Sequence, residues 1–465
     1  MEKVWLKNYP SGVDELVDVS QYQSIVDIFN DSIAKFADKP AFTNLGVTLT
    51  YRELDQKSAQ FASYLQHDLG LAKGSRVAIM MPNLLQYPIA IFGILRAGMS
   101  VVNVNPLYTA RELKHQLNDS QATAIVIVEN FAHTLQEVIA DTQVNHIVLT
   151  AIGDCCSFIK RNLVNFVIRK VKKMVPPYKL PAYHTFNQAL SMGSKRAFKP
   201  VQVVADDIAF LQYTGGTTGV SKGAVLLHRN MVANICQSAS WLNQIMQEGE
   251  EIIITALPLY HIFSLTANCM AFMKSGGLNV LITNPKDMPG FVKELGQFKF
   301  TAITGVNTLF NGLLNTPGFA DLDFSRLKMT LGGGMAVQEA VALQWHKVTG
   351  VPLLEAYGLT ETAPAVTINP MDLKEYNGTI GLPVPSTEVS IRDDEGNELG
   401  FNQPGELWVR GPQVMDGYLG RPEETAKVLT EDGWLKTGDV ATINEEGYVK
   451  IVDRKKDMIL VSGFN

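Results

Sequence analysis

The sequence is poor in cysteine and has no excess of basic residues. Its cysteines form no CxxC pair and no regular spacing, which argues against a zinc ribbon or a disulfide scaffold and suits a reducing compartment. They are Cys155, Cys156, Cys236 and Cys269. Forty Lys and Arg residues against 46 Asp and Glu residues give a net charge of −6. Because broad binding of nucleic acid depends on a basic surface, we expect no nucleic-acid partner.

We expect that the first twelve residues, MEKVWLKNYPSG, are not a secretory signal, since they contain no apolar core. Two stretches, 77–95 and 255–273, have no Lys, Arg, Asp or Glu and are long enough to span a bilayer. Both contain proline and polar side chains, so we interpret them as helices and strands of a buried core. The expected location is the cytoplasm, with peripheral contact at the inner face of the cytoplasmic membrane as an alternative.

Apolar runs rich in Val and Ile alternate with helical patterns from about residue 76 onward. This alternation predicts an α/β fold with two mostly parallel sheets, covered by helices on both faces and layered α-β-α-β-α. The predicted strands lie at 76–83, 100–106, 123–128, 208–213, 251–258, 278–284, 300–306 and 327–334. The first helices are predicted at 84–98 and 110–120.

From about residue 380 the pattern changes to short alternating strands with acidic and glycine-containing turns. Segments 386–399, 405–412 and 447–454 therefore predict an antiparallel, β-barrel-like subdomain. The predicted domains are an N-terminal α/β subdomain at 1–195, a second one at 196–380, the β subdomain at 381–453 and a final segment at 454–465.

The densest motif is a run of eleven residues, rich in glycine and threonine, that continues from the predicted strand at 208–213. Its backbone would lie at the carboxyl edge of a sheet, where α/β folds bind ligands. Glycines let N–H groups approach phosphate oxygens closely, hydroxyl groups add donors and Lys222 adds a positive charge. The run lacks the spacing of a Walker A loop. The candidate phosphate-binding residues here are Tyr213, Thr214, Gly215, Gly216, Thr217, Thr218, Gly219, Val220, Ser221, Lys222, Gly223 and Ala224, and a flexible loop that binds nothing is the alternative.

This run resembles the phosphate loop of the adenylate-forming superfamily, which includes acyl-CoA synthetases, nonribosomal-peptide adenylation domains and firefly luciferase. Those enzymes activate a carboxylate with ATP, giving an acyl-adenylate and pyrophosphate. Segment 355–361, EAYGLTE, is similar to the family segment that places an aromatic ring on adenine, a Thr on the α-phosphate and a Glu on Mg²⁺. The resemblance assigns these roles to Tyr357, Thr360 and Glu361. It also places Glu355, Ala356 and Gly358 at the nucleotide.

Three further motifs follow in the family's order. The glycines of 332–334 resemble the stretch that lines the adenine and acyl sites: Gly332, Gly333 and Gly334. Segment 437–439, TGD, resembles the ribose motif, in which Asp439 would accept from the ribose hydroxyls. Segment 453–457, DRKKD, resembles the hinge before a C-terminal domain, where Arg454 would contact ribose and Lys456 would be the pivot.

The implied chemistry requires no side-chain nucleophile. Adenylation brings a carboxylate to the α-phosphorus while pyrophosphate leaves, so it needs cations, donors and precise positioning. The resemblance gives these tasks to Lys222, Thr217, Thr360 and Glu361, with Mg²⁺ held by Glu361 and Thr217. His261 follows the predicted strand at 251–258, and in relatives the matching His lies beside the carboxylate and phosphates. A packed core histidine is the alternative for this residue.

Longer stretches of similarity indicate which carboxylic acid is the substrate. Segment 432–456 is similar over its whole length to the signature stretch of fatty acyl-CoA synthetases, and segments 3–10, 81–88 and 103–109 resemble bacterial long-chain-fatty-acid–CoA ligases. The resemblance implies ATP-dependent formation of a long-chain acyl-adenylate, followed by transfer to coenzyme A. It also implies ATP and Mg²⁺ as cofactors, an apolar tunnel for the chain, and a possible homodimer. The alternatives are an adenylating enzyme that passes the acyl group to a carrier protein, and a membrane-associated fatty-acid binding or uptake protein.

Two segments need separate interpretation. Segment 159–179 predicts a basic amphipathic helix: six apolar residues share one face, and Arg161, Arg169, Lys172 and Lys173 lie opposite. Such a helix either packs on its own domain or lies on an anionic membrane surface. The second segment is the end of the chain, where the family continues for about a hundred residues into a mobile lid with a catalytic lysine. We expect that the lid is mostly missing here, because the sequence stops at Asn465.

Overall fold

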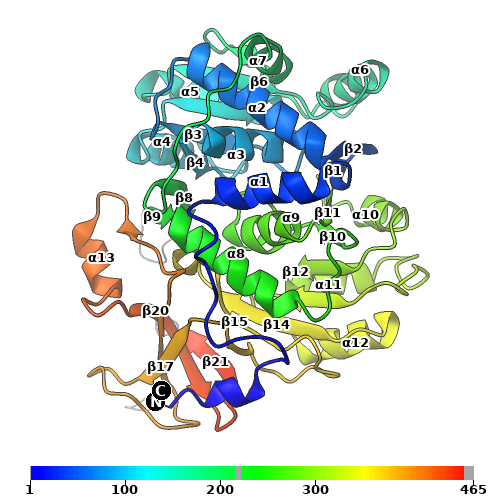
Figure 1. Ribbon diagram of the computed structural model, residues 1–465. Helices are drawn as coiled ribbons and strands as arrows, with labels where there is room; N and C mark the ends of the chain where they lie inside the picture. Colours follow the sequence, from blue (N-terminus) through cyan, green and yellow to red (C-terminus); the bar gives the residue numbers. More distant parts are fainter. Residues whose placement is uncertain (1, 215–220, 455–465) are drawn as a thin grey trace.

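The computed structural model describes residues 2–214 and 221–454 as two large sheets in a five-layered arrangement, with a smaller sheet at one end (Figure 1). One helical layer lies between the large sheets, and one covers the outer face of each. The predicted α/β class and its α-β-α-β-α layering are therefore confirmed. Within the described ranges, no helix is long and apolar enough to cross a membrane.

The first sheet has eight strands in the order β19-β9-β8-β4-β3-β5-β6-β7. All neighbours from β8 to β7 are parallel, while β9 pairs antiparallel with both β8 and β19. The strands are β3 (Arg76–Met80), β4 (Ser100–Asn103), β5 (Ala124–Val128), β6 (His146–Thr150), β7 (His184–Thr185), β8 (Ile208–Thr214), β9 (Lys222–Leu227) and β19 (Gly417–Tyr418).

The second sheet has nine strands in the order β16-β15-β14-β13-β12-β10-β11-β1-β2, parallel from β14 to β1. Antiparallel strands complete both edges. The strands are β1 (Pro40–Asn44), β2 (Val47–Thr50), β10 (Ile252–Thr255), β11 (Leu278–Leu281), β12 (Ala302–Gly305), β13 (Met329–Gly332), β14 (Leu353–Gly358), β15 (Ala365–Ile368) and β16 (Leu382–Pro383).

The two sheets exchange segments across the predicted boundary at residue 195. The early hairpin β1–β2 joins the nine-stranded sheet, while the later hairpin β8–β9 joins the eight-stranded one. This exchange ties the two α/β regions together. Sheet membership is not a division into domains, so the boundaries at 195, 380 and 453 stay predictions.

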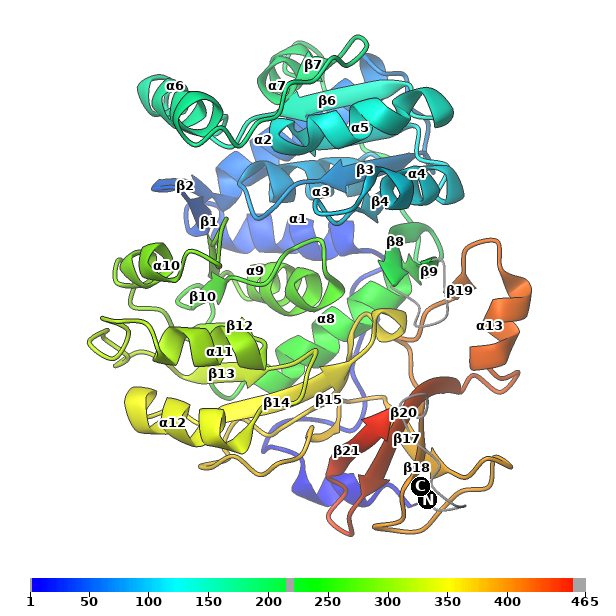
Figure 2. The same cartoon turned by 180° about the vertical axis from the view of Figure 1, so that it is seen from behind.

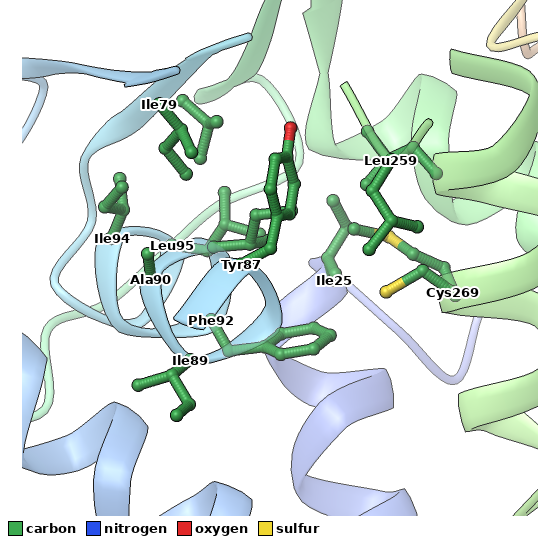
Figure 3. Close-up of a cluster of buried hydrophobic side chains, with 14 of the residues drawn as sticks. Ile25, Ile79, Tyr87, Ile89, Ala90, Phe92, Ile94, Leu95, Leu259 and Cys269 are labelled. Atoms are coloured by element: carbon green, nitrogen blue, oxygen red, sulfur yellow. The ribbon is translucent and has the colours of Figure 1, made fainter. Parts of the chain in front are cut away.

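The middle helical layer holds the largest hydrophobic cluster. It comprises α1 (Ile25–Phe36), α2 (Tyr51–His67), α3 (Gln86–Arg96), α7 (Phe186–Gly193), α8 (His228–Leu242), a π-helical turn (Ser264–Met270) and α9 (Ala271–Lys274). Every residue of α3 is buried. Its aromatic residues Tyr87 and Phe92 pack toward Ile25, Leu259 and Cys269 (Figure 3). The charge-free stretches 77–95 and 255–273 thus contribute α3, the π-helical turn and part of α9 to this layer, while their first residues belong to β3 and β10.

The outer layers are smaller. Helices α4 (Ala110–Asp119) and α5 (Ala132–Val138) cover the eight-stranded sheet, and α10 (Met288–Leu295), α11 (Asn307–Leu314) and α12 (Glu339–Thr349) cover the nine-stranded one (Figure 2). Strands covered on both faces are apolar throughout rather than alternating, which is why the sequence pattern predicted them. Short 3-10 turns lie at Val4–Asn8, Glu129–Phe131, Ile139–Asp141 and Thr360–Thr362.

The C-terminal β unit is an open sheet. Its four antiparallel strands are β17 (Glu388–Arg392), β18 (Gly405–Arg410), β20 (Leu435–Ile443) and β21 (Val449–Arg454), in the order β17-β18-β20-β21. The sequence predicted a barrel-like unit, but within residues 2–214 and 221–454 this sheet does not close on itself. Helix α13 (Pro422–Val428) precedes β20 and lies toward the first sheet (Figure 1).

The predicted helix at 159–179 is shorter than expected. Helix α6 (Phe158–Phe166) continues as a π-helical turn (Val167–Val171), after which Lys173 has a φ of 51°. Two prolines follow at 176 and 177, and proline cannot continue a helix. The segment lies at the edge of the molecule in both views (Figures 1 and 2).

Candidate functional site

A cavity of about 400 Å³ opens at the carboxyl ends of β13 and β14. Its size is that of a small-molecule site, and this edge of a parallel sheet is where α/β proteins bind ligands. The loop after β10 and strand β20 of the smaller sheet contribute further walls. The cavity therefore lies where the large sheet and the C-terminal β unit meet.

The cavity brings together predicted residues from four separate segments of the sequence. These are His261, the glycine loop after β13, the end of β14 with the turn after it, and β20. The predicted residues that line it are His261, Gly333, Gly334, Glu355, Ala356, Tyr357, Gly358, Thr360 and Asp439. The sequence motifs for adenine, ribose and α-phosphate thus share one cavity.

Glycine is required at two points of this wall by close backbone approach. A Cβ at Gly358 would lie 2.0 Å from the carbonyl oxygen of Pro364, and one at Gly333 would lie 2.9 Å from the ring of Phe263. Gly332 does not line the cavity; a Cβ there would meet Val337 at 2.5 Å. At all three positions protein atoms already fill the place of a Cβ, so glycine lets these segments pack closely.

The Tyr357 hydroxyl donates a hydrogen bond of 2.6 Å to Oδ2 of Asp439. Burial raises the pKa of Tyr357 well above its usual value, and the neighbouring Asp439 carboxylate raises it further. Tyr357 is therefore a neutral donor at any physiological pH. The contact joins the predicted adenine-stacking residue on β14 to the predicted ribose-binding residue on β20.

Glu355 has a structural contact. Its side chain is buried, and Oε1 accepts a hydrogen bond of 2.8 Å from the backbone N–H of Val337. Burial raises the pKa of Glu355, and the bond from Val337 partly opposes that shift. The carboxyl group thereby holds the loop that follows the glycines of 332–334.

His261 lies on the cavity wall rather than in the packed core. Its side chain is open to the cavity, and the surrounding walls lower its pKa by desolvation. Its Nδ1 accepts a long hydrogen bond of 3.4 Å from the N–H of Phe263. At neutral pH the imidazole is therefore uncharged, and it can present a polar nitrogen without adding positive charge.

Lys222 and Glu361 lie outside the cavity lining. Lys222, at the start of β9, forms an ion pair with Glu424 of α13 and lies 5.1 Å from the ring centroid of Tyr418. The hydroxyl of Tyr418 donates a hydrogen bond of 2.7 Å to Oε1 of Glu361. Thr360, next to Glu361, does line the cavity. Both charged residues are therefore engaged by one segment, 417–428.

Glu361 suits Mg²⁺ as a single carboxylate donor, since Mg²⁺ is usually held by one or two carboxylates together with substrate phosphates. Its side chain is half-buried. The part of the chain that the structure describes contains no cluster of three or more His, Cys, Asp or Glu residues that could hold a metal. The donor set thus fits a metal that arrives with a phosphate ligand, not a permanent protein-only site.

The glycine-rich loop is described only at its ends. It connects the antiparallel strands β8 and β9, where Thr214 pairs with Lys222 and Tyr213 pairs with Gly223. The Tyr213 hydroxyl donates to Asp119, at 2.7 Å, and Ala224 pairs with Tyr418. The carbonyl of Ser221 contacts His115 Nε2 at 2.9 Å. The following loop residues lie outside the described ranges: Gly215, Gly216, Thr217, Thr218, Gly219 and Val220. Lys456 also lies outside them.

Arg454 ends strand β21, and its backbone pairs with that of Asp439. The predicted ribose contacts are thus neighbours in the ladder, although only the backbone of Arg454 is described.

The resemblance implied an apolar tunnel, but the residues that line the apolar part of the cavity were not identified from the sequence. Met329 and Leu331 alternate along β13, Gly333 follows directly after the strand, and all three line the cavity. Since a strand rises about 3.3 Å per residue, this row runs for roughly 13 Å from the sheet edge inward. Further apolar lining residues include Leu242, Ile262, Phe263, Ala267, Ile368, Ile380 and Ile451. The sequence signal for this row was the alternation of large apolar residues with Thr330 and Gly332 in Met329–Gly332, and such a pattern is typical of any buried strand.

Comparison with known proteins agrees with this geometry. The chain is 59% identical over its whole length to a long-chain-fatty-acid–CoA ligase of Yersinia pestis and 36% identical to one of Bacillus subtilis. It covers 83% and 82% of the lengths of those relatives.

Solved structures share the fold. An anthranilate CoA ligase in complex with anthranoyl-AMP matches 96% of this chain and 81% of its own, with a TM-score of 0.83 at 22% identity. A long-chain-fatty-acid–CoA ligase of Archaeoglobus fulgidus matches 96% of this chain and 86% of its own, with a TM-score of 0.79 at 25% identity. The AMP-binding enzyme family matches residues 29–419. The chain belongs to the AMP-binding enzyme family, the adenylate-forming enzymes that its motifs resemble.

Proposed function

We propose that this protein is an ATP-dependent long-chain-fatty-acid–CoA ligase. The observation that carries the proposal is the shared cavity, in which the nucleotide motifs meet an apolar row along β13. A fatty acyl-adenylate has the same two parts, a polar nucleotide and an apolar chain. Relatives that are 59% and 36% identical to this chain carry this activity in their names.

In the first step, a fatty carboxylate oxygen attacks the α-phosphorus of ATP, the bond to the bridging oxygen breaks, and pyrophosphate leaves. Tyr357 would stack on adenine and Asp439 would accept from the ribose hydroxyls. Thr360 would donate to the α-phosphate, while His261, being neutral, would not add charge beside the incoming carboxylate. Mg²⁺ held by Glu361, with Thr217, would neutralise phosphate charge together with Lys222.

In the second step, the thiolate sulfur of coenzyme A attacks the acyl carbon of the adenylate. A thioester bond forms, the bond to the phosphate oxygen breaks, and AMP leaves. No side chain needs to become acylated, which agrees with the lack of a nucleophilic serine or cysteine motif in the sequence. The chain of the acid would stay against the apolar row while its carbonyl reacts.

The test is calorimetric binding of non-hydrolysable acyl-adenylate analogues with chains from two to sixteen carbons. Each methylene buried against the row should contribute roughly 0.8 kcal/mol until the cavity is filled. We expect affinity to rise with chain length and then level off. Equal affinity for all chain lengths would keep the nucleotide site and contradict the long-chain substrate.

We also propose that segment 158–174 binds an anionic membrane surface, from which long-chain fatty acids can be taken up. Several of its apolar side chains are exposed and do not pack on the domain: Ile159 is 80% exposed and Leu163 61%. Together with their exposed neighbours they form the α6 face, defined by Phe158, Ile159, Leu163, Phe166, Val171 and Met174. An exposed apolar strip of this kind indicates a docking surface.

The charge around the α6 face favours a lipid partner over a second protein. Residues 155–205 contain ten Lys and Arg residues and no Asp or Glu, in a chain whose net charge is −6. Basic residues beside an apolar helix face are typical of helices that lie in the interface of anionic bilayers. Lys160, Lys170, Lys172 and Lys173 are exposed there.

Arg169 has a different role from the one the helical pattern suggested. Its guanidinium pairs with both oxygens of Glu129, the closest contact being 2.8 Å, and the Glu129 side chain is only 4% exposed. Asn130 adds a hydrogen bond to the carbonyl of Met174, at 3.0 Å. These contacts hold the segment on the domain with its apolar face outward.

Co-sedimentation with vesicles tests this proposal. We expect binding to vesicles that contain phosphatidylglycerol, weaker binding at high salt, and loss of binding when Ile159, Leu163 and Phe166 are changed to Gln. The matched control changes Leu16 and Leu107, which are 67% and 68% exposed elsewhere, to Gln. Unchanged sedimentation of the triple variant, or a monomer–dimer shift in place of lipid binding, would contradict the membrane partner.

A further inference from the structure

The segment Gly417–Val428, which we call the latch segment, contacts both charged residues that the proposed function assigns to Mg²⁺ and phosphate. Glu424 pairs with Lys222, and Tyr418 donates to Glu361 at 2.7 Å. The Lys222 ammonium also makes a cation–π contact with Tyr418, 5.1 Å from the centroid of its ring. A cation and a carboxylate of one site therefore each have an internal partner on the same short segment.

The latch segment is held firmly against the site. Strand β19 pairs with β9, with Tyr418 beside Ala224, and the N–H of Leu419 donates to the carbonyl of Gly223 at 2.9 Å. The segment is also folded on itself, since the N–H of Tyr418 donates to Oγ1 of Thr425 at 2.9 Å.

A second anchor joins the latch segment to the outer helical layer. Arg421 donates to Oδ1 of Asp119 at 2.7 Å, and Oδ2 of the same carboxylate accepts from the Tyr213 hydroxyl, also at 2.7 Å. Tyr213 is the next-to-last residue of β8, the strand that leads into the glycine-rich loop. Both ends of that loop are thus connected to the latch segment, one through Asp119 and the other through Lys222.

The partner of Lys222 has a direct consequence for phosphate binding. An ammonium group has three donors and one positive charge, and a carboxylate that neutralises the charge reduces its attraction for a second anion. A nucleotide phosphate at Lys222 must therefore compete with Glu424. Lys427, which pairs with the other oxygen of Glu424, gives the carboxylate an alternative cation when Lys222 is withdrawn.

We propose that Glu424 is a positioning residue that sets the affinity for ATP: it holds Lys222 through an ion pair that exchanges for a phosphate when the nucleotide binds. The hydrogen bond from Tyr418 similarly holds the Glu361 carboxylate in position. This inference rests on the proposed function, because it takes Lys222 and Glu361 as phosphate and Mg²⁺ ligands.

The test measures binding of a non-hydrolysable ATP analogue by calorimetry, with adenosine as a second ligand. We expect Glu424→Gln to bind the ATP analogue about two- to fivefold more tightly than the unmodified protein, as for the loss of a partly exposed ion pair, and to bind adenosine with unchanged affinity. Lys222 and Glu424 are 22% and 32% exposed, so a larger effect is not expected.

Glu423→Gln is the matched control. Glu423 lies in the same turn of α13, carries the same charge, and makes no ion pair within the described residues. It should change ATP affinity less than Glu424→Gln does. In a Lys222→Met background, Glu424→Gln should have no effect, because the group through which it acts is gone.

The outcomes distinguish a failure of the proposed function from a failure of the role proposed for Glu424. If neither the ATP analogue nor an acyl-adenylate binds the unmodified protein, the proposed function fails. If both bind but Glu424→Gln leaves ATP affinity equal to that of Glu423→Gln, or weakens it, the competition is wrong and Glu424 instead supports the bound state. An effect of Glu424→Gln that persists with Lys222→Met would also overturn the proposal.

Discussion

A larger side chain at position 267 should shorten the acyl chain that the cavity accepts. Ala267 lies just after His261 on the π-helical turn, lines the cavity and is only partly buried. Its methyl group therefore faces space rather than packed atoms. A phenyl ring built there would project into the cavity opposite the row formed by Met329, Leu331 and Gly333.

The expected loss of binding affinity follows from the number of methylenes that the phenyl ring displaces. If Ala267→Phe excludes about four methylenes, the loss is about 3 kcal/mol at ~0.8 kcal/mol each, or roughly 200-fold in affinity for the longest chains. A chain too short to reach the ring should lose nothing. The chain length at which affinity levels off should fall by the same number of carbons.

The assay is the calorimetric series of acyl-adenylate analogues. Binding of the two-carbon analogue shows that the variant is folded and that its nucleotide site is intact. Leu343→Phe, on the outer helix α12, is the control for added aromatic surface, since Leu343 is 56% exposed and lies outside the cavity. A parallel loss at every chain length would refute the assignment of this wall to the acyl chain.

Three further predictions concern the residues that shape the site and the core. Tyr357→Phe removes the 2.6 Å bond to Asp439 and should lower the free energy of unfolding by about 1.5 kcal/mol, measured from the urea midpoint. Gly358→Ala should abolish adenosine binding in calorimetry, because its Cβ would lie 2.0 Å from a backbone oxygen. Burial lowers the pKa of His228 to about 4, so protonation favours the unfolded state. The resulting stability of the folded protein, at most about 3 kcal/mol, is complete above pH 6.5 and is lost as the pH falls toward 4. His228→Gln should flatten the dependence of unfolding free energy on pH in that window, and an unchanged slope would contradict this reasoning.

The layered fold could be predicted because its strands carry their signal locally. Strands such as β5 are apolar at every position, since both faces are covered, and the helices between them have the 3.6-residue pattern. The pairing of β1–β2 with the second sheet could not be predicted. That pairing joins Phe42 to Asn279, and nothing in a short window specifies a partner so distant in the sequence.

The motifs assigned to the nucleotide contribute residues that lie together in the structure, such as Tyr357 and Asp439, while their roles at a nucleotide stay predictions. The contacts of the latch segment were not predicted, because Arg421 and Asp119 are 302 residues apart and neither residue is unusual in its own segment. The exposure of the α6 face was left open for a related reason. An amphipathic pattern indicates that one face is apolar, but not whether the protein or a lipid covers it.

The two halves of the cavity differ in what binding must displace. Beside the proposed nucleotide side, Lys222 and Glu361 lie outside the lining and already have internal partners, so under the proposed function phosphate and metal would exchange one contact for another and gain modest net affinity. On the apolar side, Met329, Leu331 and Ala267 line the cavity without polar partners to displace, so each methylene of the chain adds burial without breaking a bond. If the proposed function is right, the chain should therefore supply most of the affinity for the adenylate, while ATP and AMP alone bind weakly. This division would let AMP leave readily once the acyl group has been transferred to coenzyme A.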